Sequence, residues 1–250
     1  MENTELCPLC KKNNFAIFDD HKIEGLHQRL YCLDCGLIYI SPKPKTLPVY
    51  DHEYNDYFNR PSDMKKAGIM ACTIAEIIGP EFTDTRILEV GCGNGWSTLM
   101  LKQMFHIVVG HELDEKHAWG LCRDLHIPMM HGDFENDIDL RTFDFIYAGH
   151  VIEHSWQPNK FFQRCHSLLD YKGRILLDTP DPCYINKKPQ DWHHFKTRDP
   201  FEHCCVFHQR TLAFAAEKNG FRVLWVQPNP TYQSYQILLE KVENESITSR

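Results

Sequence analysis

A short apolar run, RILEV at residues 86–90, leads directly into the glycine-rich segment GCGNG at 91–95. From there to about residue 180, apolar runs of strand length alternate with stretches of helical periodicity. This alternation predicts βαβ units, and hence a mostly parallel sheet with helices on both faces. Because ligands of such sheets bind beyond the carboxyl ends of the strands, the glycine segment is predicted to be a ligand loop.

Three kinds of ligand compete for this loop. A nucleoside-triphosphate loop requires Gly-Lys-Ser/Thr after four spacer residues, but no lysine follows Gly95 until Lys102. A dinucleotide fingerprint requires a third glycine where this chain has Trp96, which is too large for close helix-to-strand packing. The remaining pattern, Glu89 followed by glycines at alternate positions, favours a nucleoside without phosphates.

The cysteines near the start of the chain form two C-x-x-C pairs, Cys7 with Cys10 and Cys32 with Cys35. Two such turns can present four thiolates to one tetrahedral ion and leave no coordination position open. We therefore predict a structural Zn²⁺ ion in a zinc ribbon, in preference to four ordinary buried cysteines or a redox dithiol. The chain has 11 cysteines and no recognisable export signal, so we expect reduced thiols and a cytoplasmic location.

The segments ILEVGCGNG, VVGHEL, HGDF and FDFIYAGHVIEH together resemble the class I S-adenosylmethionine-dependent methyltransferases over about residues 80–225. With its four N-terminal cysteines, the chain looks like the small bacterial-type members that carry a zinc ribbon. The resemblance implies a Rossmann-like, doubly wound, mostly parallel seven-stranded sheet with an antiparallel last strand. The predicted domains are a zinc ribbon at 1–45, a linker and helical lid at 46–80, and a methyltransferase domain at 81–250, with the insert 181–208 as a substrate wall.

The resemblance also implies a cofactor site for S-adenosylmethionine. The glycine loop would contact the methionine and ribose parts, with Glu89 orienting it, and Glu112 would bind the ribose hydroxyls, since a carboxylate suits a vicinal diol. In HGDF, which could also be a plain turn, Asp133 would accept from the adenine amino group and Phe134 would cover the ring. The predicted cofactor residues are Glu89, Gly91, Cys92, Gly93, Gly95, Glu112, Leu113, Asp133, Phe134 and Gly149.

Methyl transfer depends mainly on alignment, and only a poorly acidic acceptor also needs a base. His150 and His154 lie four residues apart with Glu153 between them, so one helical turn would bring all three together. They could serve the acceptor, bind a divalent cation or only hydrogen-bond neighbouring loops. His203, in the irregular insert, is the favoured base or acceptor ligand, so the predicted catalytic residues are His150, His154 and His203.

The net charge of the chain indicates which class of methyl acceptor is favoured. Lys and Arg number 27 against 34 Asp and Glu, and the net charge of −7 disfavours binding to phosphate backbones. We therefore predict methyl transfer to a small molecule such as a sugar, lipid head group or secondary metabolite, with no membrane span and no nucleic-acid partner. Two alternatives remain: an RNA methyltransferase that grips RNA with the ribbon, and a non-catalytic zinc-ribbon scaffold. The sequence leaves the oligomeric state open.

Overall fold

The structure is a computed structural model that describes residues 6–23, 27–44, 61–79, 82–113, 126–136, 141–182, 203–229 and 234–243. Within these ranges, no helix combines the length and the apolar character needed to cross a membrane. The chain divides into two compact units. The ribbon unit comprises Met1–Pro48, His150–Gln163 and Leu177–Leu239, and the loop unit comprises Val49–Gly149, Arg164–Leu176 and Glu240–Arg250.

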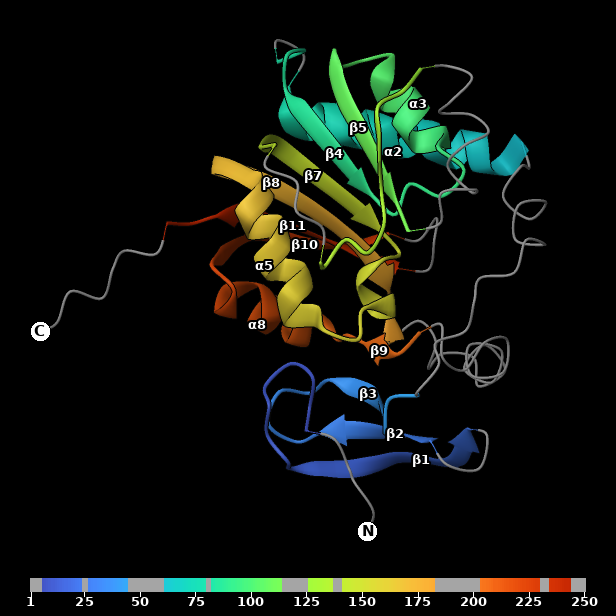
Figure 1. Cartoon of the computed structure of the whole chain (residues 1–250), viewed down its shortest axis with the longest axis vertical. Helices are drawn as coiled ribbons and strands as arrows, with labels where there is room; N and C mark the ends of the chain where they lie inside the picture. Colours follow the sequence, from blue (N-terminus) through green and yellow to red (C-terminus); the bar gives the residue numbers. More distant parts are fainter. Residues whose placement is uncertain are drawn as a thin grey trace, which may run out of the picture. The chain divides into compact units, whose positions relative to one another are not determined.

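The N-terminal part of the ribbon unit is a small antiparallel sheet, drawn in blue in Figure 1. In it, β1 (Phe15–Ile23) pairs with β2 (His27–Cys32), and β2 pairs with β3 (Ile38–Ser41). The pairing extends to a distant part of the sequence, because β3 also pairs with β9 (Cys205–Val206). The ribbon is therefore hydrogen-bonded directly to the segment that follows His203.

Two polar side chains hold the first cysteine turn of the ribbon. Asn159 Nδ2 donates a hydrogen bond to the Leu9 carbonyl at 2.7 Å, and Lys218 Nζ donates to the same carbonyl at 2.8 Å. Asn159 lies in α5 (Pro158–Leu168), and Lys218 ends α8 (Gln209–Lys218). The turn that carries Cys7 and Cys10 is thus bound to two helices from later in the chain.

The largest element is a seven-stranded sheet with the strand order β10-β11-β8-β7-β4-β5-β6. Strand β4 is parallel to both β5 and β7, β5 is parallel to β6, and the final strands are antiparallel. This confirms the predicted Rossmann-like, mostly parallel sheet. The strands are β4 (Arg86–Val90), β5 (Ile107–Glu112), β6 (Met129–His131), β7 (Phe143–Gly149), β8 (Leu169–Pro180), β10 (Phe221–Asn229) and β11 (Ser234–Lys241).

Within the loop unit, helices α2 (Pro61–Ile78) and α3 (Trp96–Lys102) pack against each other, and α3 contacts β5 (Figure 1). The first of these helices lies within the segment predicted as a linker and helical lid, 46–80. Met70 and Ile74, four residues apart on one face of α2, are both buried. Their burial explains why this segment folds as a helix against the rest of the unit.

The start of β4 is fixed by Arg86. Its backbone N–H and its Nε both donate to Asp144 Oδ2, at 2.8 and 2.9 Å, and its Nη2 donates to Asp144 Oδ1 at 2.6 Å. The same Nη2 reaches Asp170 Oδ2 at 2.9 Å. Because Asp144 lies in β7, this contact keeps two neighbouring parallel strands in register, so that Gly91 and Gly149 emerge at the same edge of the sheet.

Several predicted segments fall outside the described residues. They are residues 46–60 of the predicted linker and lid, residues 114–125 between β5 and β6, and residues 183–202 of the predicted substrate wall. The domain limits stay predictions.

Candidate functional site

The glycine loop leaves β4 with a backbone that glycine adopts most easily. Gly91, Gly93 and Gly95 have φ angles of 68°, 55° and 83°, all in the left-handed region. A Cβ added at Gly93 would meet no atom of the described residues within 4 Å, so the space beside this residue is open with respect to them. Backbone conformation therefore requires the glycines, and the open side of Gly93 can accept the edge of a ligand.

Glu112, the last residue of β5, holds this loop in place. Its Oε2 accepts a hydrogen bond from the Gly93 N–H at 2.8 Å, and its Oε1 accepts one from the Leu113 N–H at 2.8 Å. Each carboxylate oxygen has a further lone pair, so the pair of oxygens can also accept from a vicinal diol. The position of Glu112 is compatible with the predicted ribose contact, which stays a prediction.

Glu89 lies in β4 below the loop and is buried. Its carboxylate accepts hydrogen bonds from the hydroxyls of Ser97 and Thr98, the latter at 2.5 Å, so it ties β4 to the first turn of α3. Burial raises the pKa of Glu89 to about 7, although the two hydroxyls act in the opposite direction. Glu89 was predicted from the sequence, but Ser97 and Thr98 were not. Only their position in the first turn of the helix after the glycine loop could have indicated these contacts.

The HGDF segment follows β6 and forms a turn. Asp133 Oδ1 accepts from the Glu135 N–H at 3.0 Å, and its Oδ2 accepts from Asn136 Nδ2 at 2.6 Å. The ring of Phe134 is buried and stands edge-on to His111, with 5.1 Å between the ring centroids. The turn alternative thus describes the contacts of Asp133, and the adenine contacts of Asp133 and Phe134 stay predictions.

Other predicted cofactor residues lie at the carboxyl ends of the strands. Leu113 is 54% exposed, Cys92 is buried, and a Cβ at Gly149 would collide with the Tyr147 hydroxyl. Nearby in the sequence, Trp96 Nε1 is buried and has no hydrogen-bond partner among the residues described. An open glycine loop, a carboxylate beside it and a tryptophan N–H without a partner in the described ranges fit a nucleoside-type cofactor.

His150 follows β7 directly and has a φ of 56°, which is uncommon for a residue other than glycine. Its N–H donates to the Asp178 carbonyl at 2.7 Å. Its ring approaches two buried carboxylates, since Nδ1 is 3.3 Å from Glu153 Oε1 and Nε2 is 3.8 Å from Asp178 Oδ1. A histidine whose backbone is held in the left-handed region by a specific hydrogen bond is typical of a functional position.

Glu153 is the buried centre of a histidine cluster. Burial alone would raise the pKa of its carboxyl, but the neighbouring His150, His154 and His203 imidazoles outweigh burial and lower that pKa to about 2. The rings of His154 and His203 stand edge-on, with 4.8 Å between their centroids. Burial lowers the pKa of His203 to about 4, and the neighbouring His154 imidazole acts in the same direction. The structure therefore brings together all three histidines that the sequence analysis singled out.

Asp178 and Thr179 belong to this cluster but were missed by the sequence analysis. Asp178 is buried near the end of β8, and its Oδ2 accepts hydrogen bonds from Asn229 Nδ2 at 2.6 Å and Gln236 Nε2 at 3.1 Å. Burial raises its pKa. Thr179 Oγ1 donates to Glu153 Oε2 at 3.1 Å. In the sequence, these two residues could have been recognised only as a polar Asp-Thr pair near the end of an apolar strand.

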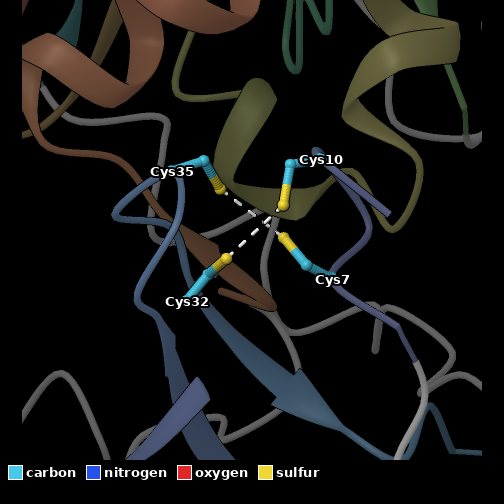
Figure 2. Close-up of side chains that lie close together, drawn as sticks. All are labelled: Cys7, Cys10, Cys32 and Cys35. Atoms are coloured by element: carbon cyan, nitrogen blue, oxygen red, sulfur yellow. Dashed lines mark hydrogen bonds between the residues drawn. The ribbon is translucent and has the colours of Figure 1, made fainter. Parts of the chain in front are cut away.

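Figure 2 shows the side chains of the four ribbon cysteines directed toward one common centre. The Sγ atoms of Cys7 and Cys35 are 3.6 Å apart, those of Cys10 and Cys32 are 3.5 Å apart, and all four lie within 4.8 Å of one another. Four thiolates around a zinc ion at about 2.3 Å would be about 3.8 Å apart. The hydrogen bond from Cys35 lowers the pKa of the Cys7 thiol to about 5, so one thiolate forms readily.

Comparison with known proteins identifies the family. Residues 62–226 match the family model described as a methyltransferase domain. A curated relative from Mycolicibacterium smegmatis, described as a probable S-adenosylmethionine-dependent methyltransferase, is 29% identical over 97 residues. That match covers 38% of this chain and 38% of the relative, so it spans well under half of either protein.

Solved structures share the fold. A SAM-dependent methyltransferase from Aquifex aeolicus superposes with a TM-score of 0.60 at 18% identity, covering 78% of this chain and 100% of that chain. Magnesium protoporphyrin IX methyltransferase from Synechocystis superposes with a TM-score of 0.57 at 15% identity, covering 79% and 90% of the two chains. The family match spans most of the chain, and the sheet and glycine loop agree with it. The chain therefore belongs to the methyltransferase-domain family, among the class I S-adenosylmethionine-dependent methyltransferases.

Proposed function

We propose that this protein is an S-adenosylmethionine-dependent methyltransferase that acts on a small-molecule acceptor. The observation that carries the proposal is the glycine loop, whose three left-handed glycines lead from β4 into α3 and whose Gly93 N–H is held by Glu112. The cofactor supplies an electrophilic methyl group when bound. The net charge of −7 supports a small acceptor over a nucleic acid, because the field of the protein repels phosphate backbones.

His150 is proposed as the base that takes a proton from the acceptor. Its ring approaches the carboxylates of Glu153 and Asp178, and the carboxylate of Asp178 stabilises an imidazolium after proton uptake. Its side chain is 38% exposed, whereas those of the two carboxylates are at most 2% exposed. The imidazole can therefore exchange a proton with an incoming molecule while the carboxylates stay inside. His154 and His203 are proposed to bind the acceptor side of the same cluster.

Binding of S-adenosylhomocysteine, measured by calorimetry, tests the first part of the proposal. We expect the wild-type protein to bind and Glu112→Ala to lose about 100-fold in affinity, because a carboxylate that binds two hydroxyls contributes several kcal/mol. Glu76→Ala, an exposed substitution on α2, is the matched control and should bind like the wild type. Undetectable binding to the wild type would favour a scaffold protein and overturn the proposed activity.

The acceptor class is tested with tritiated S-adenosylmethionine. We would incubate the protein separately with a small-molecule extract and with total RNA, and follow the label. Label in the small-molecule fraction is expected. Label retained on RNA, together with normal cofactor binding, would reject the small acceptor while leaving the methyltransferase assignment intact.

The four cysteines are proposed to bind a structural Zn²⁺ ion. The Sγ separations fit a tetrahedral four-thiolate shell, which leaves no position for a substrate. We expect Cys7→Ser to lose this zinc and to unfold the ribbon at lower denaturant concentration, without loss of S-adenosylhomocysteine binding. Cys72→Ser, at an exposed cysteine of α2, should keep both properties. Unchanged zinc content and stability in Cys7→Ser would refute the assignment.

The cytoplasmic location also stays a proposal. It rests on cysteine usage, since the nine cysteines in the described part of the chain are all free thiols. Cell fractionation would test it.

A further inference from the structure

A second group of potential metal ligands lies in the ribbon unit, apart from the cysteines in sequence and in ligand type. Glu153, His154 and His203 each present a ligand atom, and these atoms all lie within 4.8 Å of one another. Glu153 and His154 belong to the short helix η1 (Ile152–His154), and His203 comes just before β9. The third ligand therefore comes from a segment about 50 residues away, which neighbouring positions in the sequence do not reveal.

The buried carboxylate of this group is only half satisfied. Glu153 Oε2 accepts the hydrogen bond from Thr179 Oγ1, which fixes the plane of the carboxylate. Glu153 Oε1 is buried and accepts no hydrogen bond of normal geometry within the described ranges. The nearest potential donors are His150 Nδ1 at 3.3 Å and His154 Nε2 at 4.0 Å. A buried carboxylate oxygen without a close hydrogen-bond donor is available as a ligand for a cation.

His154, the last residue of η1, also has the features of a metal ligand. His154 Nδ1 is buried and has no hydrogen-bond partner in the part of the chain that the structure describes. A buried imidazole nitrogen without a partner can bind a metal ion, and the ring of His154 lies beside the carboxylate of Glu153 and the imidazole of His203. The unsatisfied oxygen of Glu153 and the unsatisfied nitrogen of His154 are independent observations on two adjacent residues.

The kinds of ligand restrict the class of ion. Two imidazoles and one carboxylate suit Zn²⁺, Fe²⁺ or Mn²⁺, whereas Ca²⁺ and Mg²⁺ prefer shells made mostly of oxygen. Three protein ligands also leave coordination positions open, unlike four thiolates. The carboxylate is 2% exposed and the His154 side chain 21% exposed, so the histidine side of the group reaches solvent.

We propose that Glu153, His154 and His203 bind one divalent transition-metal ion, through Glu153 Oε1 and one nitrogen of each imidazole, with the remaining positions open to water or to an acceptor. The site does not require the proposed function. A role in binding the acceptor would rest on that function, and metal binding is therefore tested without cofactor or acceptor.

The experiment uses the full-length protein, stripped of metal with a chelator and titrated with Co²⁺. Cobalt bound to thiolates gives an intense charge-transfer absorption in the near ultraviolet, which imidazole and carboxylate ligands do not give. We expect the wild type to bind two Co²⁺ ions per chain. The ion at the cysteines should give the charge-transfer absorption of thiolate ligands, called the thiolate band below, and the ion at the histidine cluster should not. Cys7→Ser should lose the equivalent with the band and keep the other.

The ligand variants are His154→Ala, His203→Ala and Glu153→Gln. Each should bind the second equivalent at least about 100-fold more weakly, with an unchanged thiolate band. Thr179→Val should weaken it about 10-fold, because it removes only the hydrogen bond that orients the carboxylate. His106→Ala, whose side chain is 71% exposed, is the matched control and should bind both equivalents normally.

Two results would overturn the proposal. The first is a wild-type protein that binds a single equivalent, with the thiolate band, up to millimolar Co²⁺. The second is a second equivalent whose affinity is the same in His203→Ala, His154→Ala and Glu153→Gln as in the wild type. Circular dichroism of each variant shows whether it is folded, and the near-isosteric Glu153→Gln keeps the test decisive if an alanine variant unfolds.

Discussion

Two buried glutamates, one in each unit, differ in how their charge is accommodated. Glu89 has two hydroxyl partners and no cation among its principal interactions, and burial raises its pKa to about 7. Glu153 is equally buried, but three imidazoles surround it and lower its pKa to about 2. Burial acts in the same direction on both residues. The neighbours therefore decide which glutamate is partly protonated near neutral pH and which is fully ionised.

The two candidate sites around these residues are built differently. The loop site comes from one continuous stretch, because Glu89, the three glycines and Glu112 all lie within β4, the loop and β5. The histidine site combines η1, the end of β8 and the segment before β9. Local backbone conformation thus defines the first site, and long-range packing defines the second.

The strongest test of this difference is His150→Asn, because asparagine tolerates the left-handed backbone of this position. We expect the methyl-transfer rate to the labelled small-molecule fraction to fall about 1000-fold, the loss expected for a general base. The affinity for S-adenosylhomocysteine should stay within about twofold, since His150 is not among the predicted cofactor residues. His106→Asn is the exposed control. An equal loss of cofactor affinity and rate would show that the two sites do not act separately.

The second test concerns Glu89. Its pKa in the folded protein, about 7, lies above the ordinary value of 4.5. The stabilisation it provides is therefore complete below pH 4.5 and is lost as the pH rises through 7. Glu89→Gln removes this dependence, so relative to wild type the variant should gain about 3 kcal/mol in free energy of unfolding between pH 4.5 and 8.

Urea unfolding across this pH range measures the effect, without cofactor. Glu76→Gln, at an exposed position of α2, controls for the general effect of removing one carboxylate. A stability difference between Glu89→Gln and wild type that does not change with pH would mean that Glu89 is ionised in the folded protein.

The third test separates conformation from space in the loop. Gly93→Ala places a methyl group where no atom of the described residues lies within 4 Å, so it collides with none of them. The left-handed φ of 55° alone should cost about 1 kcal/mol of stability. The affinity for S-adenosylhomocysteine should fall by more than about tenfold, because the methyl group fills the open side of the loop. If affinity fell only in proportion to stability, the ligand would not approach Gly93.

The smallest effect is expected for Asp144→Asn. This change weakens the contacts of Arg86 with β7, but the two side chains are 34% and 39% exposed, so solvent screens their attraction. We expect a loss of about 1 kcal/mol in the free energy of unfolding. Arg86 lowers the pKa of Asp144, so the loss should be present at neutral pH and disappear in acid. An equal loss at pH 3 and pH 7 would exclude an ionic origin.

Individual residues show what was predictable. Gly91, Gly93 and Gly95 were predicted as a loop from their spacing after an apolar run, and all three have the left-handed backbone that glycine adopts most easily. Glu112 was predicted from the resemblance to the methyltransferase family, in agreement with its position at the end of the second strand, and its ribose contact stays a prediction. Asp178 was missed because an aspartate near the end of an apolar strand has no distinctive spacing, and its contacts with Asn229 and Gln236 depend on two later strands.

The sequence by itself determined the βαβ order, the glycine loop and the paired cysteines, because each depends on backbone conformation or on spacing within a few residues. Only the tertiary structure decided that β3 pairs with β9, and that His203 stands beside Glu153 and His154. The physical reason is that burial and charge act through space. A carboxyl group's pKa depends on which side chains the fold brings near it, and residues about 50 positions apart have no fixed distance until the chain is packed.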